Sequence, residues 1–190
     1  MLWRTTEQLG ECLARGGFHV VSGGYAGTAE AASFGASRVA AASVAGVTCP
    51  SAFANTPRGG VTGPNQYLSE QQTASDLLTR AAMLVHPVDA CVVLPGGLGT
   101  LTKLSLAWNM AAVESWNGAS GQSTRVILAW RDPWESLLAS VGEALRIPAD
   151  LMQCVRFVSS VEEIMQQLEQ VKVTNGAAAN GSSSSSSAAQ

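Results

Sequence analysis

Charged residues are scarce in this sequence, and long uninterrupted apolar runs are missing. Only 13% of the 190 residues are charged, and Lys+Arg 11 against Asp+Glu 14 give a formal net charge of −3. The absence of a run of Lys or Arg argues against nucleic acid or an anionic membrane as the main partner. Gly, Ser, Pro or a charge interrupts every apolar stretch before the roughly 18 residues that a membrane span needs. The sequence therefore predicts neither a nucleic-acid-binding nor a membrane protein.

Cysteine is also sparse, and its spacing excludes the usual cysteine chemistry. The four cysteines fall singly and far apart, at Cys12, Cys49, Cys91 and Cys154. Structural metal sites use close pairs such as C-x-x-C, so no metal site is predicted. The amino-terminal residues form a helical pattern with two glutamates, unlike a signal or transit peptide. These features predict buried thiols in a reducing compartment and a cytoplasmic protein.

Apolar residues are plentiful, at 46% of the chain, and they allow one sizeable core. The length suits a single domain, which we place at residues 1–174. From residue 175 the sequence reads NGAAANGSSSSSSAAQ, with no charge and no bulky apolar side chain. Such a segment buries too little surface to offset its ordering entropy. Residues 175–190 are therefore predicted to be a disordered tail.

Helical and strand patterns alternate along the domain. Short strands with unbroken apolar runs between helices are typical of a parallel sheet that is covered on both faces. The predicted class is α/β, a Rossmann-like doubly wound sheet. The expected helices are 5–15, 28–42, 68–84, 100–115, 133–146 and 160–171; the expected strands are 18–22, 44–48, 90–94, 125–130 and 155–158; and residues 50–66 are expected to form a long loop.

Two glycine-rich turns follow predicted strands and precede predicted helices. Ligands bind at the carboxyl ends of strands in such sheets, and a helix N-terminus favours a phosphate. The alternative is that these glycines only make tight turns. Neither turn matches G-x-G-x-x-G or the Walker pattern, so NAD binding and ATP hydrolysis are poorly supported. The candidate phosphate-binding residues are Gly23, Gly24, Gly27 and Thr28 in the first turn and Gly96, Gly97, Gly99 and Thr100 in the second.

The second turn carries a resemblance to a known family. The segment LPGGLGTLTK resembles the PGGxGTxxE signature of the Lonely Guy family of "lysine decarboxylase-like" Rossmann proteins, and GGYAGTAEA is similar to a turn in a bacterial branch of that superfamily. The resemblance implies a dimeric protein that needs no cofactor. It implies a phosphoribohydrolase, which releases a base, often an N6-modified adenine as in cytokinin nucleotides, from a nucleoside 5′-monophosphate.

The resemblance also assigns a role to Arg80, which falls where the family has its active-site arginine. Arg80 would pair with the phosphate or the ribose of the substrate; the alternative is a surface salt bridge with Asp76, one helical turn earlier. Glu30 is the obvious substitute for a missing catalytic carboxylate, although an acid in the first turn of a helix can simply compensate the helix dipole. Trp130, at the end of a strand, is a candidate to stack on the base.

Lys103 stands where the family signature ends in glutamate. A carboxylate there would stabilise the positive charge that builds on the sugar as the glycosidic bond breaks, whereas a lysine would repel it. The alternative is that the family's glutamate only caps the helix, with Thr100 as the N-cap and residue 103 as the third helical residue of a capping box. Lysine does not suit that role either, because a cation in the first turn opposes the helix dipole. Lys103 does suit holding an anion without cleaving it. The alternative function is therefore a non-catalytic carrier or sensor of a phosphorylated ligand, as in molybdenum-cofactor carrier proteins, which share this fold.

The start of the chain is the second departure from the family. Family members begin with a strand and a glycine-rich turn ahead of the first helix, and that strand is central in their sheet. Here Met1 lies only a few residues ahead of the helix. The resemblance therefore implies a gap in the middle of the sheet, and a fragment or an incomplete gene model is the simplest explanation.

Overall fold

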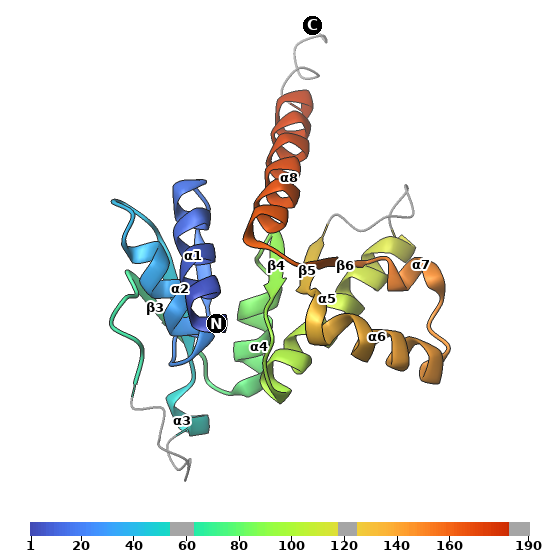
Figure 1. Cartoon of the computed structure of the whole chain (residues 1–190), viewed down its shortest axis with the longest axis horizontal. Helices are drawn as coiled ribbons and strands as arrows, with labels where there is room; N and C mark the ends of the chain where they lie inside the picture. The colour runs from blue at the N-terminus through green and yellow to red at the C-terminus, as the bar shows by residue number, and fades with distance from the viewer. Residues whose placement is uncertain (54–62, 118–124, 183–190) are drawn as a thin grey trace, which may run out of the picture.

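The computed structural model describes residues 1–53, 63–117 and 125–182, with side chains described up to Val171. Helices and parallel strands alternate along the chain, which confirms the predicted α/β class. The elements, labelled in Figure 1, are α1 (Leu2–Arg15), β1 (Val20–Ser22), α2 (Thr28–Ser37), β2 (Val44–Thr48), α3 (Pro50–Phe53), β3 (Glu70–Thr73), α4 (Leu77–Val85), β4 (Ala90–Val93), α5 (Leu98–Asn117), β5 (Val126–Trp130), α6 (Arg131–Leu145), α7 (Ala149–Met152), β6 (Val155–Val158) and α8 (Val161–Ser182).

The strands form two three-stranded parallel sheets. One has the order β1-β2-β3 and the other β4-β5-β6, with registers such as Val20 opposite Val44 and Ala90 opposite Val126. The middle strand of each sheet is buried almost throughout, as expected for parallel strands with helices on both faces. Among the described residues, the amino-terminal and carboxy-terminal sheets share no paired strands.

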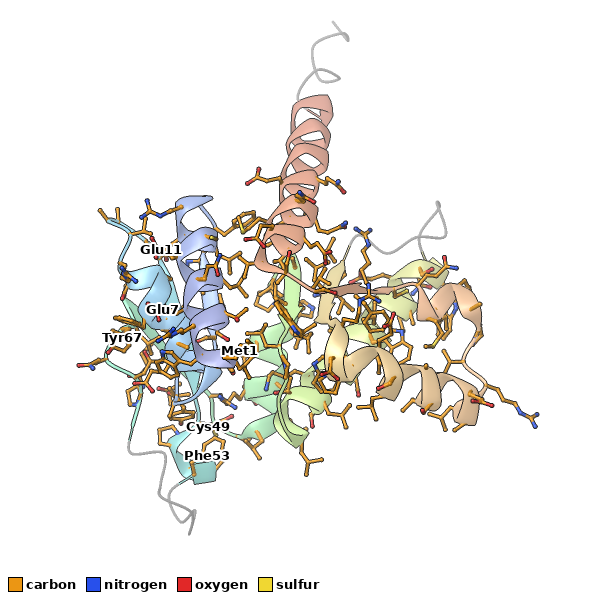
Figure 2. All side chains as sticks on the ribbon, viewed as in Figure 1. Met1, Glu7, Glu11, Cys49, Phe53 and Tyr67 are labelled. Carbon is orange, nitrogen blue, oxygen red and sulfur yellow. The ribbon has the colours of Figure 1, made fainter. Side chains whose placement is uncertain are left out.

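Helices α1 and α2 pack closely against each other beside the first sheet. Two glycines allow this approach: a methyl group at Gly10 would overlap the carbonyl of Ala32, and one at Gly35 would overlap the carbonyl of Glu7. Arg38, which follows α2, pairs with Glu7 at 2.9 Å and Glu11 at 3.7 Å on α1. Figure 2 labels both glutamates on this helix. The small-residue sequence of α2 thus serves helix packing.

The second sheet carries the larger part of the core. One face of β5 packs with α5 and α6 around Trp108 and Trp134, and the other packs with α8 and α1 around Leu9 and Ile164. The indole nitrogen of Trp108 donates to the Leu151 carbonyl at 2.7 Å, so its polar atom is satisfied inside the core. Among the described residues, no helix has the length and apolar character needed to cross a membrane.

The strands β1 and β4 are not paired with each other, and this interruption lies where the resemblance predicted a gap. The remaining differences are local. The predicted helix 68–84 is wrong in its first part, because Glu70–Thr73 forms β3, an exposed polar edge strand whose sequence carries no apolar alternation. A single turn, α3, begins the predicted loop 50–66, of which residues 54–62 lie outside the described residues. Helix α7 was not predicted.

Two predicted boundaries bear on the site and on the domain division. Helix α5 begins at Leu98 rather than residue 100, which changes the positions of Thr100 and Lys103 in its first turns. Helix α8 is described to Ser182, past the predicted boundary at residue 175, and residues 183–190 lie outside the described residues. The disordered tail stays a prediction.

Candidate functional site

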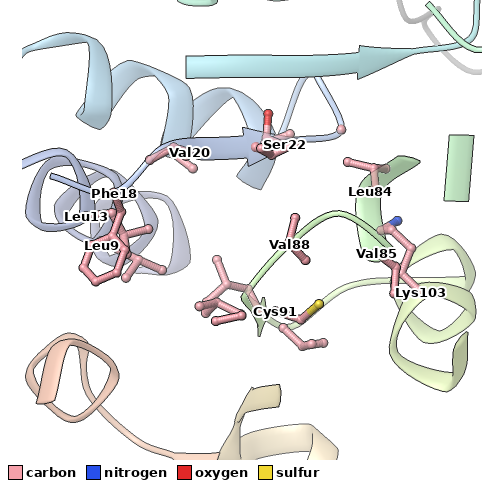
Figure 3. Close-up of a pocket in the computed structure, with 18 of the residues that line it drawn as sticks. Leu9, Leu13, Phe18, Val20, Ser22, Leu84, Val85, Val88, Cys91 and Lys103 are labelled. Atoms are coloured by element: carbon pink, nitrogen blue, oxygen red, sulfur yellow. The ribbon is translucent and has the colours of Figure 1, made fainter. Parts of the chain in front are cut away.

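A cavity of about 860 Å³ lies between the two sheets. Strands β1 and β4 form its sides, and α1, α2, α4, α5 and α8 contribute further lining residues. Figure 3 shows Val20 and Ser22 on β1 across the cavity from Cys91 on β4, with Lys103 at one end. Both glycine-rich turns lie after these two strands, so the cavity opens onto the place where the sequence predicted a ligand.

Arg80, on α4, is held at the carboxyl end of β1. Its Nε donates to the Val47 carbonyl at 2.8 Å, and its Nη2 donates to the Gly23 carbonyl at 2.7 Å. The guanidinium carbon also lies 5.3 Å from the centre of the Tyr25 ring and 5.5 Å from that of Phe53, within the range of a cation–π interaction. Burial lowers the pKa of Arg80 below its ordinary value. The arginine remains charged and is fixed in place.

The alternative for Arg80, a salt bridge to Asp76, is wrong. Asp76 is instead the N-cap of α4: one carboxylate oxygen accepts from the backbone nitrogens of Leu78 and Thr79, each at 2.8 Å. Ser75 and Thr79 donate their hydroxyls to the other oxygen. These hydrogen bonds lower the pKa of Asp76 to about 2, and the bond from the Thr79 amide has the largest effect. Asp76 therefore fixes the start of the helix that carries Arg80.

Lys103, on α5, faces the same end of the cavity as Arg80. Its Nζ donates to the Gly99 carbonyl, one turn earlier, at 2.6 Å. Burial lowers the pKa of Lys103 below its ordinary 10.5, and the positive charge of Arg80 lowers it further by a smaller amount. The capping-box interpretation is wrong because α5 begins at Leu98, so that Thr100 is its third residue and Lys103 its sixth. The two cations therefore share one end of the cavity and repel each other.

The first glycine turn depends on backbone conformations that suit glycine. Gly24 has φ +72°, and a methyl group there would lie 3.1 Å from the Cα of Gly46 on β2. Gly27, with φ +80°, precedes the first residue of α2. The amide of Asn65 donates to the Gly24 carbonyl at 2.8 Å, and its side chain donates to the Tyr25 carbonyl at 3.3 Å. The close approach of Gly24 to β2 and the two hydrogen bonds from Asn65 therefore hold the first glycine turn in one conformation.

The second glycine turn leads directly into α5. The Gly97 carbonyl accepts from the amides of Thr100 and Leu101 at 2.9 and 3.1 Å. Gly96 leaves room for the Thr100 side chain, which would overlap a methyl group at that position. The absence of side chains at Gly96 and Gly97 leaves this helix start accessible to a small ligand.

The predicted site residues divide into two groups. The cavity lining includes Gly23, Thr28, Arg80, Thr100 and Lys103 from the predicted set. The residues of that set outside the lining are Gly24, Gly27, Glu30, Gly96, Gly97 and Gly99. The structure thus brings the two cations and the two threonines together, and it leaves the candidate carboxylate outside. The chemical roles of all these residues stay predictions.

Among the described lining residues, the acidic one is Asp89, and it lies at the end of the cavity opposite to Arg80 and Lys103. Asp89 immediately precedes β4, whereas Thr100 and Lys103 follow it. Within the described lining, the end that holds Arg80 and Lys103 therefore has no carboxylate. The arrangement can bind an anion, and it offers no acid to protonate a leaving group or to stabilise a sugar cation there.

Tyr25 is a site residue that the sequence analysis missed. It is buried, it lines the cavity, and its hydroxyl accepts from the Cys49 amide at 2.8 Å. Its ring meets Phe53 edge-on at 5.1 Å, and Figure 2 shows Phe53 close to Cys49. A tyrosine directly after two glycines was the available signal. Trp130, the predicted base contact, instead packs against both core clusters of the second sheet and is not part of the cavity lining.

Comparison with known proteins places the chain in a family. The model of the SLOG cluster4 family matches residues 2–113, which include both glycine turns, Arg80 and Lys103. The chain belongs to the SLOG cluster4 family. No curated protein matches the sequence significantly. The match establishes SLOG membership and a Rossmann-like fold, and the Lonely Guy branch in particular stays a prediction.

Solved structures similar to this SLOG chain agree on the fold. The molybdenum cofactor binding protein of Rippkaea orientalis superposes with a TM-score of 0.65 at 20% identity, covering 90% of this chain and 87% of that one. The molybdenum cofactor carrier protein of Chlamydomonas reinhardtii superposes with a TM-score of 0.63 at 16% identity, covering 90% and 89%. At these identities the likeness shows the fold alone.

Proposed function

We propose that the protein binds a phosphorylated small molecule and holds it without cleaving it, as a carrier or sensor. One observation carries this proposal: Arg80 and Lys103 face the same end of the cavity, where its described lining has no carboxylate. Two cations that repel each other in a partly buried place gain stability from a bound anion. A phosphate is the anion that suits this position, between two helix starts.

Further groups near Arg80 and Lys103 support a phosphate as the ligand. Thr28 and Thr100 line the cavity and supply hydroxyl donors, and the start of α5 contributes the positive end of its helix dipole. Arg80 already gives two donors to the Gly23 and Val47 carbonyls, so it serves mainly as a fixed charge. Lys103 is the cation that can turn from the Gly99 carbonyl to the ligand. We therefore assign Lys103 the direct contact.

The fold neighbours support the same function. Two of them are described as binding or carrying the molybdenum cofactor. That cofactor and nucleoside monophosphates are the ligands to test first. Molybdenum analysis of the protein as purified from cells tests the first ligand directly.

The phosphoribohydrolase implied by the Lonely Guy resemblance is the second candidate, and it rests on Arg80 and the second glycine turn. Glu30, the predicted substitute for the missing glutamate, lies on α2 outside the cavity lining, which argues against that role. If the rest of the hydrolase site is intact, Lys103→Glu restores release of the base from AMP or N6-substituted AMP. Lack of base release by this variant, when it is folded, counts against the hydrolase ancestry.

The deciding experiment measures binding and cleavage on the same sample. Calorimetric titration with AMP, N6-substituted AMP, adenosine and inorganic phosphate is followed by chromatography of the free base. We expect AMP to bind at least about tenfold more tightly than adenosine, since the phosphate meets both cations, and we expect no base release. Lys103→Gln should weaken AMP binding by about tenfold.

The matched control is Arg131→Gln, which removes a half-exposed cation on α6 that is not part of the cavity lining. This variant should bind AMP like the wild type. Equal affinity for AMP and adenosine would overturn the phosphate site. Base release by the wild type, above the level of Lys103→Gln, would replace the carrier function with the hydrolase.

The homodimer implied by the resemblance belongs to the same proposal. Leu78 on α4 and Leu98 at the start of α5 are each 83% exposed, and both lie on helices that carry site residues. Covering such side chains would stabilise an association of two copies. Light scattering at micromolar concentration distinguishes a dimer from a monomer.

A further inference from the structure

The side-chain amine of Lys103 has a defined place beside the proposed phosphate site. Its Nζ donates to the Gly99 carbonyl at 2.6 Å, and Lys103 lines the cavity together with Leu84 and Val85 of α4 (Figure 3). A single donated hydrogen bond leaves the rest of the amine open to a ligand. The ion pairs of the described residues do not include Lys103, and the described lining at this end holds no carboxylate. Within the part of the chain that the structure describes, this amine therefore has no acidic partner.

The surroundings of Lys103 also favour its neutral, nucleophilic form. Burial lowers the pKa of the amine, and the Arg80 guanidinium adds a smaller lowering. Arg80 is held in place, because its Nε and Nη2 donate to the Val47 and Gly23 carbonyls. Partial burial beside a second cation is a common way in which proteins prepare a reactive lysine. At a given pH, a larger fraction of Lys103 is therefore the free amine than of an exposed lysine.

The other titratable side chains of the described lining are placed differently. They are His19, Tyr25, Asp89 and Cys91. His19 and Asp89 precede β1 and β4, so they lie at the end away from Lys103. The Tyr25 hydroxyl bonds the Cys49 amide at 2.8 Å, and Cys91 lies within β4. Arg80 is therefore the charged group of the lining that acts on Lys103.

The groups around Lys103 determine which electrophile suits it. An aldehyde forms an imine with lysine by losing water, and an acid assists that step. The described lining at this end offers no carboxylic acid for it. An acyl phosphate needs no such acid, because an oxygen of its own phosphate takes the proton that the amine releases. Arg80, Thr100 and the start of α5 are placed to stabilise the departing phosphate.

We propose that Lys103 is an acylation site for acyl phosphates, which place their leaving group in the phosphate site. Acylation rests on the proposed function, because that site must hold the phosphate. The neutral Nζ attacks the acyl carbon, and the bond between that carbon and the phosphate oxygen breaks. The electron pair of this bond leaves with the phosphate, and one proton passes from Nζ to a phosphate oxygen. The products are an amide on Lys103 and hydrogen phosphate.

Acylation has a consequence for the ligand that the site holds. An amide nitrogen carries no positive charge, so acylation removes one of the two cations at this end of the cavity. The charge-assisted hydrogen bond from Lys103 to a phosphate is lost with it. The acylated protein therefore binds anions more weakly, and acyl phosphates switch the phosphate site off.

The sequence supplies an internal control, because its two lysines are Lys103 and Lys172. The 190-residue protein is incubated with acetyl phosphate, and peptide mass spectrometry follows the acetyl groups on each lysine over time. We expect Lys103 to be acetylated at least about tenfold faster than Lys172, since its amine is held beside the bound reagent. The rate at Lys103 should saturate with the concentration of acetyl phosphate, whereas the rate at Lys172 should rise in proportion to it.

Two further reagents separate the phosphate site from simple reactivity of the amine. Inorganic phosphate, at constant ionic strength, should slow the acetylation of Lys103 by acetyl phosphate and leave that of Lys172 unchanged. N-acetoxysuccinimide carries the same acetyl group without a phosphate. The ratio of the Lys103 rate to the Lys172 rate should therefore be several-fold smaller with this reagent than with acetyl phosphate.

Two variants complete the design. Arg131→Gln removes a half-exposed cation outside the cavity lining, so it should be acetylated like the wild type at both lysines. Lys103→Gln removes the amine and resembles the acylated side chain in charge. The acetylated wild type should bind AMP about tenfold more weakly than the untreated protein, as is expected of Lys103→Gln. Treatment of Lys103→Gln with acetyl phosphate should change its AMP affinity little.

Equal acetylation of Lys103 and Lys172 would overturn the acylation site. A preference for Lys103 that inorganic phosphate does not reduce, or that is as large with N-acetoxysuccinimide, would overturn it as well. The calorimetric titration with AMP and adenosine involves no acylation, so it tests the phosphate site alone. Tighter binding of AMP without preferential acetylation would refute only the acylation. Equal binding of AMP and adenosine would refute the proposed function and, with it, the acylation that depends on it.

Discussion

The Nη2 of Arg80 lies 2.7 Å from the carbonyl oxygen of Gly23, so a side chain of α4 holds the turn that follows β1. The same guanidinium bonds the Val47 carbonyl on β2 at 2.8 Å. Arg80 thereby links the ends of β1 and β2 in the first sheet to α4, the helix that precedes the second sheet in the chain. Arg80, at the end of the cavity that also holds Lys103, is therefore also a structural link.

Arg80→Lys should destabilise the protein. A lysine cannot reach both carbonyls with the fixed geometry of a guanidinium, so at least one partly buried carbonyl loses its charged donor. We expect the free energy of unfolding to fall by roughly 1–3 kcal/mol, as measured by urea denaturation. Arg131→Lys, at a half-exposed ion pair with Glu135, should change it by less than about 0.5 kcal/mol. Equal losses in the two variants would contradict the structural role of Arg80.

Anion binding should depend on pH through Lys103. Burial and the charge of Arg80 lower its pKa below 10.5, so the free protein loses this positive charge at a lower pH than an exposed lysine would. The affinity for AMP should therefore fall as the pH rises towards 10.5, and calorimetry between pH 7 and pH 10 measures this fall. Lys103→Gln should show a flatter profile. A flat profile in the wild type would remove Lys103 from the site.

The same pKa shift has a consequence for stability. The unfolded chain keeps the lysine proton up to its ordinary pKa, whereas the folded protein releases it earlier. Between those two values the unfolded state binds more protons, so the contribution of Lys103 to stability increases with pH. Ligand-free stability and ligand affinity should therefore change in opposite directions over this range.

The sequence predicted most of the fold because most strands carry their own signal. The apolar runs Val44–Thr48 and Val155–Val158 were predicted at their observed bounds. Strand β3 was missed because Glu70-Gln-Gln-Thr is polar and lies at an exposed edge, where only its pairing with β2 makes it a strand. The separation of β1 from β4 has no local signal either, since each strand reads as an ordinary buried strand. Only the family resemblance predicted it.

The site was predicted in part. The glycine turns and Lys103 are recognisable from their sequence motif, and the structure places Gly23, Thr100 and Lys103 on one cavity. The aromatic surroundings of Arg80 were not predictable, because Tyr25 and Phe53 approach it from segments distant in the sequence. Such contacts depend on how the helices and strands pack together, and no local sequence pattern indicates them.

Asp76→Ala should destabilise α4 and weaken AMP binding together, because the N-cap fixes the start of the helix that carries Arg80. Asp76→Asn is the matched control, since asparagine caps helices as well as aspartate does. The melting temperature should fall for the alanine variant and change little for the asparagine variant. If both variants melt alike, the capping role is contradicted.

Acid titration tests the same residue through its charge. The folded-state pKa of Asp76 is lowered from 3.8 to about 2, so its contribution is present above 3.8 and is lost as the pH falls through about 2. The difference in melting temperature between the wild type and Asp76→Ala should therefore shrink between pH 4 and pH 2. A difference that stays constant over this range would mean that the carboxylate charge contributes nothing.

The contact between α1 and α2 provides a test of packing away from the cations. A methyl group at Gly10 would overlap the Ala32 carbonyl, which is backbone and cannot turn aside. Gly10→Ala should therefore lower the free energy of unfolding by about 1–3 kcal/mol, despite the better helix propensity of alanine. Gly99→Ala is the matched control, because in α5 the new methyl group would meet only the Lys103 Nζ, at 3.9 Å. That variant should be unchanged or up to about 1 kcal/mol more stable. If Gly10→Ala were as stable as Gly99→Ala, α1 and α2 would have to lie farther apart, and α1 would then no longer bring Leu9 and Leu13 to the cavity.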